Sequence, residues 1–418
     1  MDAQQALTVL GAVASAVGGY YAWRALDGPA IAASQARFCE QRTDISARFG
    51  ELCEISADMH IAARPSLARI GATALLWEDA MRPPAPVRLD RLRLAWDPAL
   101  PPQNPKLLKA ARHVLPKVAK RARYGRYSLA MGDLARPSLF EDRFSFRLVS
   151  ADWNAPQGPS LVFGSGQYFD LVDQNEAVAH ELAVETRTSP RPPSWRRMPM
   201  RSVLKRDPLS LKKRVVLPAI ATLTVRRTPD GQGTFFLLHR GVGQVATGGG
   251  VYGPIPAGMH QPASLSPLGY RRDLDIWHTI MREYNEELLG APEATGAGGQ
   301  EVDYTAPPYG ALDRALTEGS LRVWCFGMAL EPLNLAVCVL TVAVFESAVF
   351  DTIFAEAVPW NEEGTLISGP RQEAAITGLP LSEEAIRDLP SPRIAPPAAG
   401  LLHLALEHRD LLLGAAGT

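Results

Sequence analysis

The fold of this chain is decided by the stretch Trp277-His-Thr-Ile-Met-Arg-Glu-Tyr-Asn-Glu-Glu-Leu-Leu-Gly290. Wound as a helix at about 100° per residue, it places its apolar side chains along one side; these are Trp277, Ile280, Met281, Tyr284 and Leu288. Three glutamates, Glu283, Glu286 and Glu287, follow the i, i+3, i+4 spacing that brings side chains together on the neighbouring side. The spacing predicts an amphipathic helix with one acidic face.

Three carboxylates on one helical face repel one another unless a cation neutralises their charge. Oxygen ligands of this kind suit a hard cation such as Mg²⁺ or Mn²⁺. An acidic helix face is also commonly a solvated surface with no ligand at all. The order of the residues around the glutamates favours the metal site.

The segment Arg282-Glu283-Tyr284-Asn285-Glu286-Glu287 resembles the core of the Nudix box, whose second half reads Arg-Glu-apolar-any-Glu-Glu-any-Gly-apolar. The resemblance implies a Nudix-type α/β/α sandwich with a mixed sheet. It also implies hydrolysis of the pyrophosphate linkage of a nucleoside diphosphate derivative with Mg²⁺ or Mn²⁺. By the same resemblance Glu283, Glu286 and Glu287 hold the metal, and Glu283 is a further ligand or a base. Arg282 then orients the glutamates, and a late base is sought at Glu346, Glu362 or Glu363.

The first half of the box departs from the family pattern. The family has a glutamate eight residues before the arginine, where this chain has Leu274, and we expect Asp273 or Asp275 to replace it. Leu289 stands where the box closes with a glycine, and Gly290 follows it. These departures keep a second hypothesis open, a catalytically inactive Nudix-fold nucleotide sensor or scaffold protein at the membrane.

The length and composition are those of a folded protein with more than one domain. The chain has 418 residues, 46% of them hydrophobic and 21% charged, enough for two or three cores. Its net charge of -1 predicts no specific nucleic-acid partner. We expect five segments: an N-terminal hydrophobic helix (1–24), a helical segment (25–83), an α+β region (84–190), a basic Pro-rich connector (191–211) and a Nudix-like domain (212–418). The arrangement of an N-terminal region, the segment 169–181 and a Nudix-like domain resembles that of actinobacterial proteins.

Residues 6–23 carry no charged side chain and reach the short end of what spans a bilayer. Tyr20, Tyr21 and Trp23 lie at one end of this run, as interfacial aromatic residues do, and Arg24 follows. The pattern predicts a transmembrane helix, a single-pass anchor that holds the chain at the cytoplasmic side of the cell membrane. The alternative is a packed helix in a cytoplasmic protein.

Further metal or disulfide sites are not indicated. The four cysteines form no CxxC pair and are expected to be small buried side chains. Glu176 and His180 lie one helical turn apart, but a zincin helix requires a second histidine. We therefore interpret residues 175–185 as an ordinary helix.

Several segments of the C-terminal half have strand or helix patterns. Residues 215–225 and 233–239 flank a Pro-Asp-Gly turn and predict a hairpin. Residues 335–345 are apolar throughout and predict a buried central strand. Ser382 has the position of an N-cap, and residues 396–413 predict a terminal helix.

Overall fold

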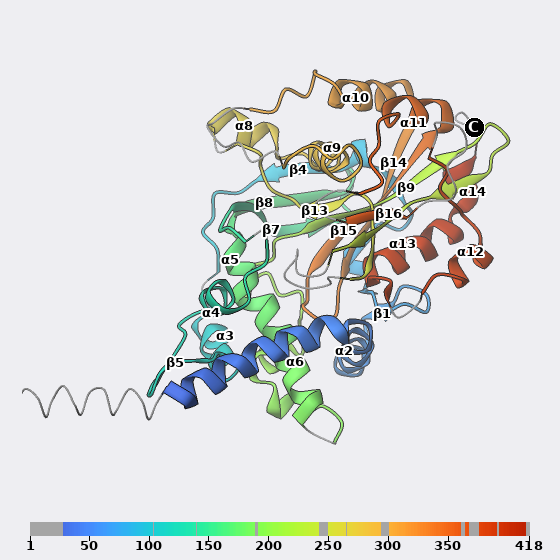
Figure 1. Ribbon diagram of the computed structural model, residues 1–418. Helices are drawn as coiled ribbons and strands as arrows, with labels where there is room; N and C mark the ends of the chain where they lie inside the picture. Colours follow the sequence, from blue (N-terminus) through green and yellow to red (C-terminus); the bar gives the residue numbers. More distant parts are fainter. Residues whose placement is uncertain are drawn as a thin grey trace, which may run out of the picture.

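The computed structural model shows a mixed α/β protein built around one large sheet, which confirms the predicted fold class at that level (Figure 1). The structure describes residues 28–102, 104–138, 140–188, 191–241, 250–264, 266–293, 301–360, 364–367, 376–390 and 393–414. The strands of the large sheet run in the order β1 (Ala68–Arg69), β2 (Leu76–Trp77), β14 (Leu321–Leu330), β15 (Val337–Glu346), β9 (Ala219–Arg227), β10 (Gly233–Phe235) and β17 (Leu379–Pro380). Strand β3 (Val87–Arg88) also pairs with β14, and β13 (Ala257–Met259) also pairs with β9.

Strand β15 is the buried central strand that its unbroken apolar sequence predicts. It runs parallel to β9, with Cys338 opposite Ala219, and antiparallel to β14. Every residue from Val337 to Phe345 is buried. Because helices cover both faces of this part of the sheet, neither face needs polar side chains.

Helices cover the two faces of the sheet (Figure 1). Helices α9 (Ile276–Glu287), α10 (Tyr309–Glu318) and α11 (Ser347–Ile353) lie on one face, and α13 (Pro396–Glu407) lies on the other. Successive residues of β15 alternate between the two layers. Phe345 packs against Tyr284 of α9, whereas Val344 belongs to the cluster that contains Leu401 of α13. The two apolar clusters account for the stacking of the three layers.

Helix α9 confirms the predicted amphipathic helix. Trp277, Ile280, Met281 and Tyr284 are at most 5% exposed and face the sheet. The chain leaves the helix through Gly290, whose φ of 69° is the left-handed conformation that favours glycine after a helix. The glycine that ends this segment is therefore Gly290, one position after Leu289.

The other patterns of the C-terminal half are also confirmed. Strands β9 and β10 form the predicted antiparallel hairpin. The Ser382 hydroxyl accepts a hydrogen bond from Ala385 N at 3.2 Å and caps α12 (Glu383–Arg387). The terminal helix is divided at His408 into α13 and α14 (Arg409–Leu413). A three-stranded sheet of β12 (Tyr252–Pro254), β11 (Leu237–Arg240) and β16 (Gly364–Ile367) and the helix α8 (Pro267–Arg272) complete this half among the described residues.

The N-terminal helices are shorter than the pattern predicts. Residues 28–47 are helical and α2 (Phe49–Ala63) follows, but the chain then forms β1 and β2 before residue 80. Pro65 explains the end of α2, because proline excludes the helical conformation at the preceding residue. Arg64 accordingly has φ -143° and ψ 89°.

Residues 89–188 form a small α+β unit. Its strands are β4 (Arg93–Trp96), β8 (Ser160–Gln167) and β7 (Phe144–Asp152). The basic stretch 106–123 is only partly helical, because α3 (Pro105–Ala110) is followed by the hairpin of β5 (Lys117–Ala119) and β6 (Ala122–Arg123). The remaining helices are α4 (Tyr127–Leu134), α5 (Tyr168–Leu171), a π-helix (Val172–Glu176) and α6 (Ala177–Thr188).

Two buried arginines join this unit to the large sheet. Arg201 lies in α7 (Pro199–Leu204) and donates to the carbonyl oxygens of Pro332 and Leu333. Arg214 donates to the carbonyl oxygen of Leu335 at 2.6 Å. These carbonyls belong to the turn between β14 and β15, where no strand partner satisfies them. Arg201 belongs to the predicted connector (191–211) and Arg214 follows it, and both side chains are fully enclosed.

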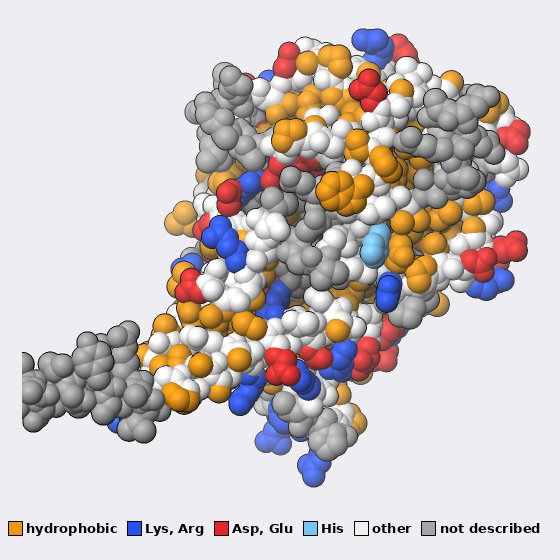
Figure 2. All heavy atoms as spheres, viewed as in Figure 1, with side chains coloured by type: hydrophobic (Ala, Val, Ile, Leu, Met, Phe, Trp, Pro, Cys, Tyr) orange, Lys and Arg blue, Asp and Glu red, His pale blue; other side chains and the backbone are white. Residues whose placement is uncertain are grey.

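The predicted membrane anchor has to be corrected. Within the part of the chain that the structure describes, no helix is both long and apolar enough to cross a bilayer, so neither the transmembrane helix nor the location that depended on it is supported. The apolar helix α13, for example, has 12 residues and spans about 18 Å, against roughly 30 Å of hydrocarbon. Residues 6–23, which carried the prediction, lie outside the described residues. On the face shown in Figure 2, acidic and basic side chains are interspersed among apolar and neutral ones.

Candidate functional site

A small polar pocket lies beside the acidic side of α9. It has a volume of about 30 Å³, which is room for roughly two water molecules. Its lining consists of Arg143, Gln261, Pro262, Ala263, Arg282, Glu283, Glu286 and Glu293. Two of the three predicted metal ligands therefore share one pocket with two arginines.

Glu283 and Glu286 reach this pocket from successive turns of α9. Glu286 is 8% exposed and Glu283 is half-buried. The Glu283 carboxylate lies directly over the backbone of β13 at Gly258, where a Cβ atom would overlap it. Gly258 is thus the position that lets this carboxylate approach the strand.

Glu287, the third predicted ligand, is directed to a different place. Its carboxylate accepts a hydrogen bond from the backbone N–H of Ala257 at 3.2 Å, and it is 1% exposed. Glu287 does not line the pocket that Glu283 and Glu286 share. Among the residues that the structure describes, no three His, Cys, Asp or Glu side chains are grouped as metal ligands. The metal remains a prediction, and its carboxylate ligands do not all converge.

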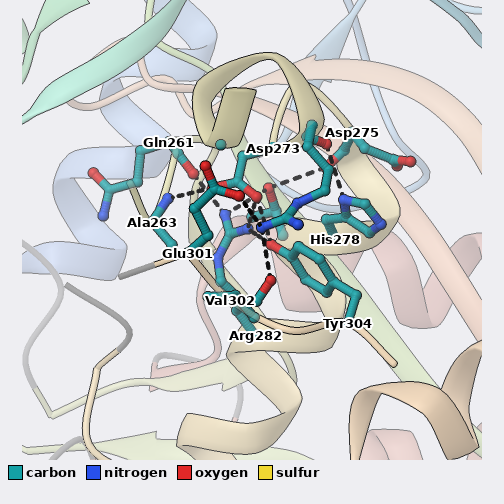
Figure 3. A network of polar contacts seen from close by, with 12 residues as sticks. Gln261, Ala263, Asp273, Asp275, His278, Arg282, Glu301, Val302 and Tyr304 are labelled. Carbon is teal, nitrogen blue, oxygen red and sulfur yellow. Dashed lines mark hydrogen bonds and ion pairs between the residues drawn. The ribbon is translucent and has the colours of Figure 1, made fainter. Parts of the chain in front are cut away.

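Arg282 anchors the wall of the pocket (Figure 3). Its guanidinium donates to the Tyr304 hydroxyl and, at 2.6 Å, to the carbonyl oxygen of Gln261. It also lies 3.5 Å from Asp273, with which it forms an ion pair. These partners hold the loop 261–263 against α9, so Arg282 positions the pocket wall through the loop.

Asp273 and Asp275, the two candidates for the missing first glutamate, have different roles. Asp273 is 1% exposed and accepts hydrogen bonds from the Tyr304 hydroxyl at 2.7 Å and from Ala263 N at 2.8 Å. Asp275 instead accepts from Trp277 N at 2.7 Å and is the N-cap of α9. Burial is the main cause that raises the pKa of Tyr304, so its hydroxyl stays protonated and able to donate. Asp273 is therefore the one of the two that pairs with Arg282.

Arg143 and Glu293 belong to the pocket although their sequence context does not indicate it. Arg143 precedes β7 in the α+β unit, and it forms ion pairs with Glu293 and, at 3.0 Å, with Glu141. Arg143 can approach the pocket because β7 is hydrogen-bonded to the C-terminal half. Phe146 N donates to the His260 carbonyl oxygen at 3.1 Å. No local pattern links residues so far apart in the chain, and only the fold brings them together.

The candidate late base Glu346 lies far from this pocket. It forms ion pairs with Arg227 at 3.0 Å and with Arg322 at 3.8 Å, at the C-terminal end of β9. Gly258, over which Glu283 lies, pairs with Ile220 at the other end of the same strand. Ile220 and Arg227 are seven residues apart in an extended strand, a distance of about 23 Å. The other candidates, 362 and 363, lie outside the described residues.

Glu176 and His180 form a structural network in the α+β unit. Glu176 pairs with Arg42 at 2.6 Å, and His180 Nδ1 lies 2.8 Å from the Tyr127 hydroxyl. Burial and the nearby Arg42 lower the pKa of His180 to about 3, so the ring is neutral. Cys53, Cys325 and Cys338 are buried as expected, whereas Cys39 is half-buried.

Comparison with known proteins adds no relative to this description. No known family model matches the chain, and no curated protein matches it. The resemblance to Nudix hydrolases therefore rests on the helix residues 282–287 and remains a prediction.

Proposed function

We propose that this chain is a Nudix-type hydrolase that cleaves the pyrophosphate linkage of a nucleoside diphosphate derivative with the help of a divalent metal. The proposal is carried by one observation. Glu283 and Glu286, which occupy the box positions of metal ligands, share a small polar pocket with Arg143 and Arg282. Carboxylates and guanidinium groups together are what recognition of a metal-bound phosphate requires.

The donors of this pocket fit Mg²⁺ or Mn²⁺. Glu283 and Glu286 would hold the ion, and Glu293 adds a further carboxylate to the lining. All of these are hard oxygen ligands, and Mg²⁺ keeps several water molecules when few protein ligands are present. A pocket with room for roughly two waters suits such an ion. The bound metal would neutralise phosphate oxygens and activate a water molecule.

The protein's own groups have distinct parts in this proposal. Arg282 is held by Asp273 and Tyr304, and so it keeps the loop 261–263 at the pocket. Arg143 enters the pocket from the α+β unit, where it is paired with Glu293 and Glu141, and it would contact a phosphate oxygen of the bound substrate. Glu283 lies over Gly258, and this contact determines where its carboxylate would hold the metal.

The position of Glu287 favours a second candidate function, nucleotide binding without hydrolysis. Its carboxylate is turned to Ala257 N, which leaves the pocket with fewer box glutamates than an active Nudix site employs. In this case the same pocket binds a nucleoside diphosphate derivative and the chain acts as a sensor. Both candidate functions require that the chain binds the nucleoside diphosphate derivative, but only the hydrolase cleaves it.

The test is hydrolysis of a panel of nucleoside diphosphate derivatives by the full chain with Mg²⁺ or Mn²⁺. Glu286→Gln is compared with Glu318→Gln, which changes an exposed glutamate of α10. Metal-dependent turnover that is lost in Glu286→Gln and kept in Glu318→Gln supports the hydrolase. Binding without turnover, measured by calorimetry, identifies the sensor. If no compound of the panel binds or turns over, both candidates are rejected.

A further inference from the structure

A larger cavity lies in the α+β unit, apart from the pocket beside α9. Its volume is about 110 Å³, several times the roughly 10–15 Å³ that one water molecule needs. It is enclosed by α3, by α5 with the π-helix, and by the basic segment before β9. The lining residues are Pro101, Pro102, Asn104, Leu107, Leu108, Arg126, Asp170, Asp173, Gln174, Lys213, Arg214 and Val215. The proposed hydrolase does not use any of them.

The floor of this cavity is rigid and buried. Gln174 accepts a hydrogen bond from Val215 N at 3.2 Å and donates to the carbonyl oxygen of Asp170 at 2.8 Å. Arg214 donates to Asn175 at 3.0 Å, and the structure offers its buried Nε–H no acceptor among the described residues. Gln174 and Asn175 belong to the π-helix Val172–Glu176, a helix type that is rare and is frequently found at functional sites. The floor of the cavity is therefore preformed, and the Arg214 Nε–H is a donor that no described residue accepts from.

Opposite charges face this cavity from different elements. Asp170 of α5 and Asp173 of the π-helix are three residues apart, about one helical turn. Burial raises the pKa of both carboxyl groups. Asp173 lies 3.7 Å from Arg126, an ion pair too long for a hydrogen bond. Lys213 supplies a second cation from the segment before β9. A bound ammonium group would offset the free-energy cost of burying the two charged carboxylates. A bound carboxylate would pair with Arg126 and Lys213.

We propose that this cavity binds a small zwitterion of amino-acid size. Asp170 and Asp173 bind its ammonium group, and Lys213 with Arg126 binds its carboxylate. Leu107 and the 43% exposed Leu108 of α3 contact its aliphatic part. An anion alone would face two carboxylates, and a cation alone would face three basic side chains. A ligand that carries both charges satisfies both sets.

The test is isothermal titration of the full chain with single L-amino acids. We expect at least one to bind, and we expect Asp170→Asn and Lys213→Met each to weaken that binding at least tenfold. Matched controls are Asp90→Asn and Lys109→Met, which change exposed residues outside the cavity lining. The controls and Glu286→Gln in the other pocket should leave the affinity unchanged. Circular dichroism establishes that each variant is folded.

Three results would overturn the proposal. The first is that no amino acid of the panel binds to the wild-type chain. The second is that binding persists undiminished in Lys213→Met, a variant whose fold should be intact because no hydrogen bond of the described residues depends on the Lys213 ammonium. The third is that acetate alone or methylammonium alone binds as tightly as the amino acid, which would indicate a site for a single charge.

Discussion

The Glu283 carboxylate lies against Gly258 so closely that a Cβ atom on residue 258 would overlap it. The glycine is therefore part of the site, since it determines where this carboxylate rests. The atoms that would be displaced are the end of a flexible side chain, whereas the backbone of β13 need not move. A change at this position should alter the site and leave the fold in place.

We predict that Gly258→Ala lowers metal-dependent turnover at least tenfold and changes the free energy of unfolding by less than about 1 kcal/mol. Gly125→Ala is the neutral control, because a Cβ there meets nothing within 4 Å. Gly310→Ala is the opposite control, because its Cβ would overlap the carbonyl oxygen of Thr305, and it should unfold more readily. Turnover and urea denaturation measured on the three variants distinguish the cases. Unchanged turnover in Gly258→Ala would show that Glu283 has no part in the reaction.

Replacing Glu286 should affect turnover, whereas replacing Glu287 should affect stability. Glu287→Ala leaves the half-buried Ala257 N–H without the acceptor it has at 3.2 Å, a loss of about 1 kcal/mol in unfolding free energy. Glu287→Gln keeps an acceptor oxygen and should recover most of that stability. Glu286→Gln should instead abolish turnover with little change in stability. Equal stabilities of Glu287→Ala and Glu287→Gln, measured by urea denaturation, would contradict this assignment.

Asp273 should matter more for stability than its neighbour Asp275. Asp273→Asn removes the charge that faces the buried Arg282, and leaving such an arginine without its partner costs about 3 kcal/mol. Asp275→Asn is the matched control, because asparagine caps a helix as well as aspartate does. The measurement is the midpoint of urea denaturation at neutral pH. A loss of equal size in both variants would show that the Arg282 pair is not what Asp273 contributes.

Three buried histidines should make the protein sensitive to acid. Burial, with a nearby arginine in each case, lowers the pKa of His60, His180 and His260 to about 3. In the unfolded chain a histidine has a pKa of about 6.5, so between these values only the unfolded state binds the proton. Stability is fully present above pH 6.5 and is lost as the pH falls toward 3. At pH 5 the loss is about 2 kcal/mol for each histidine.

The prediction is checked by urea denaturation at several pH values between 8 and 4.5. His260→Gln should show a shallower dependence on pH than the wild type, because one proton-binding group is gone from the unfolded state. His403→Gln, whose side chain is 45% exposed, should keep the wild-type dependence. A wild-type stability that does not change between pH 7 and pH 5 would contradict the burial of neutral histidines.

The elements that depend on local periodicity could be predicted from the amino-acid sequence. Residues 277–288 repeat their apolar side chains at helical spacing, and α9 forms there with those side chains against the sheet. Residues 335–345 are apolar without interruption, and β15 forms there at the centre of the sheet. Each pattern reflects the period of a single helix or strand, so neighbouring residues suffice to predict it.

Only the tertiary structure decided which groups meet at the pocket. Arg143 reaches Glu283 and Glu286 because β7 joins the C-terminal half, and Glu287 turns away because β13 presents an N–H beside it. The i, i+3, i+4 spacing places three glutamates on one side of a helix, but it does not determine what packs against each of them. Those contacts depend on strand pairing between distant segments, which the period of a helix does not encode. The sequence therefore indicated the acidic helix, and the fold selected which of its carboxylates face the pocket.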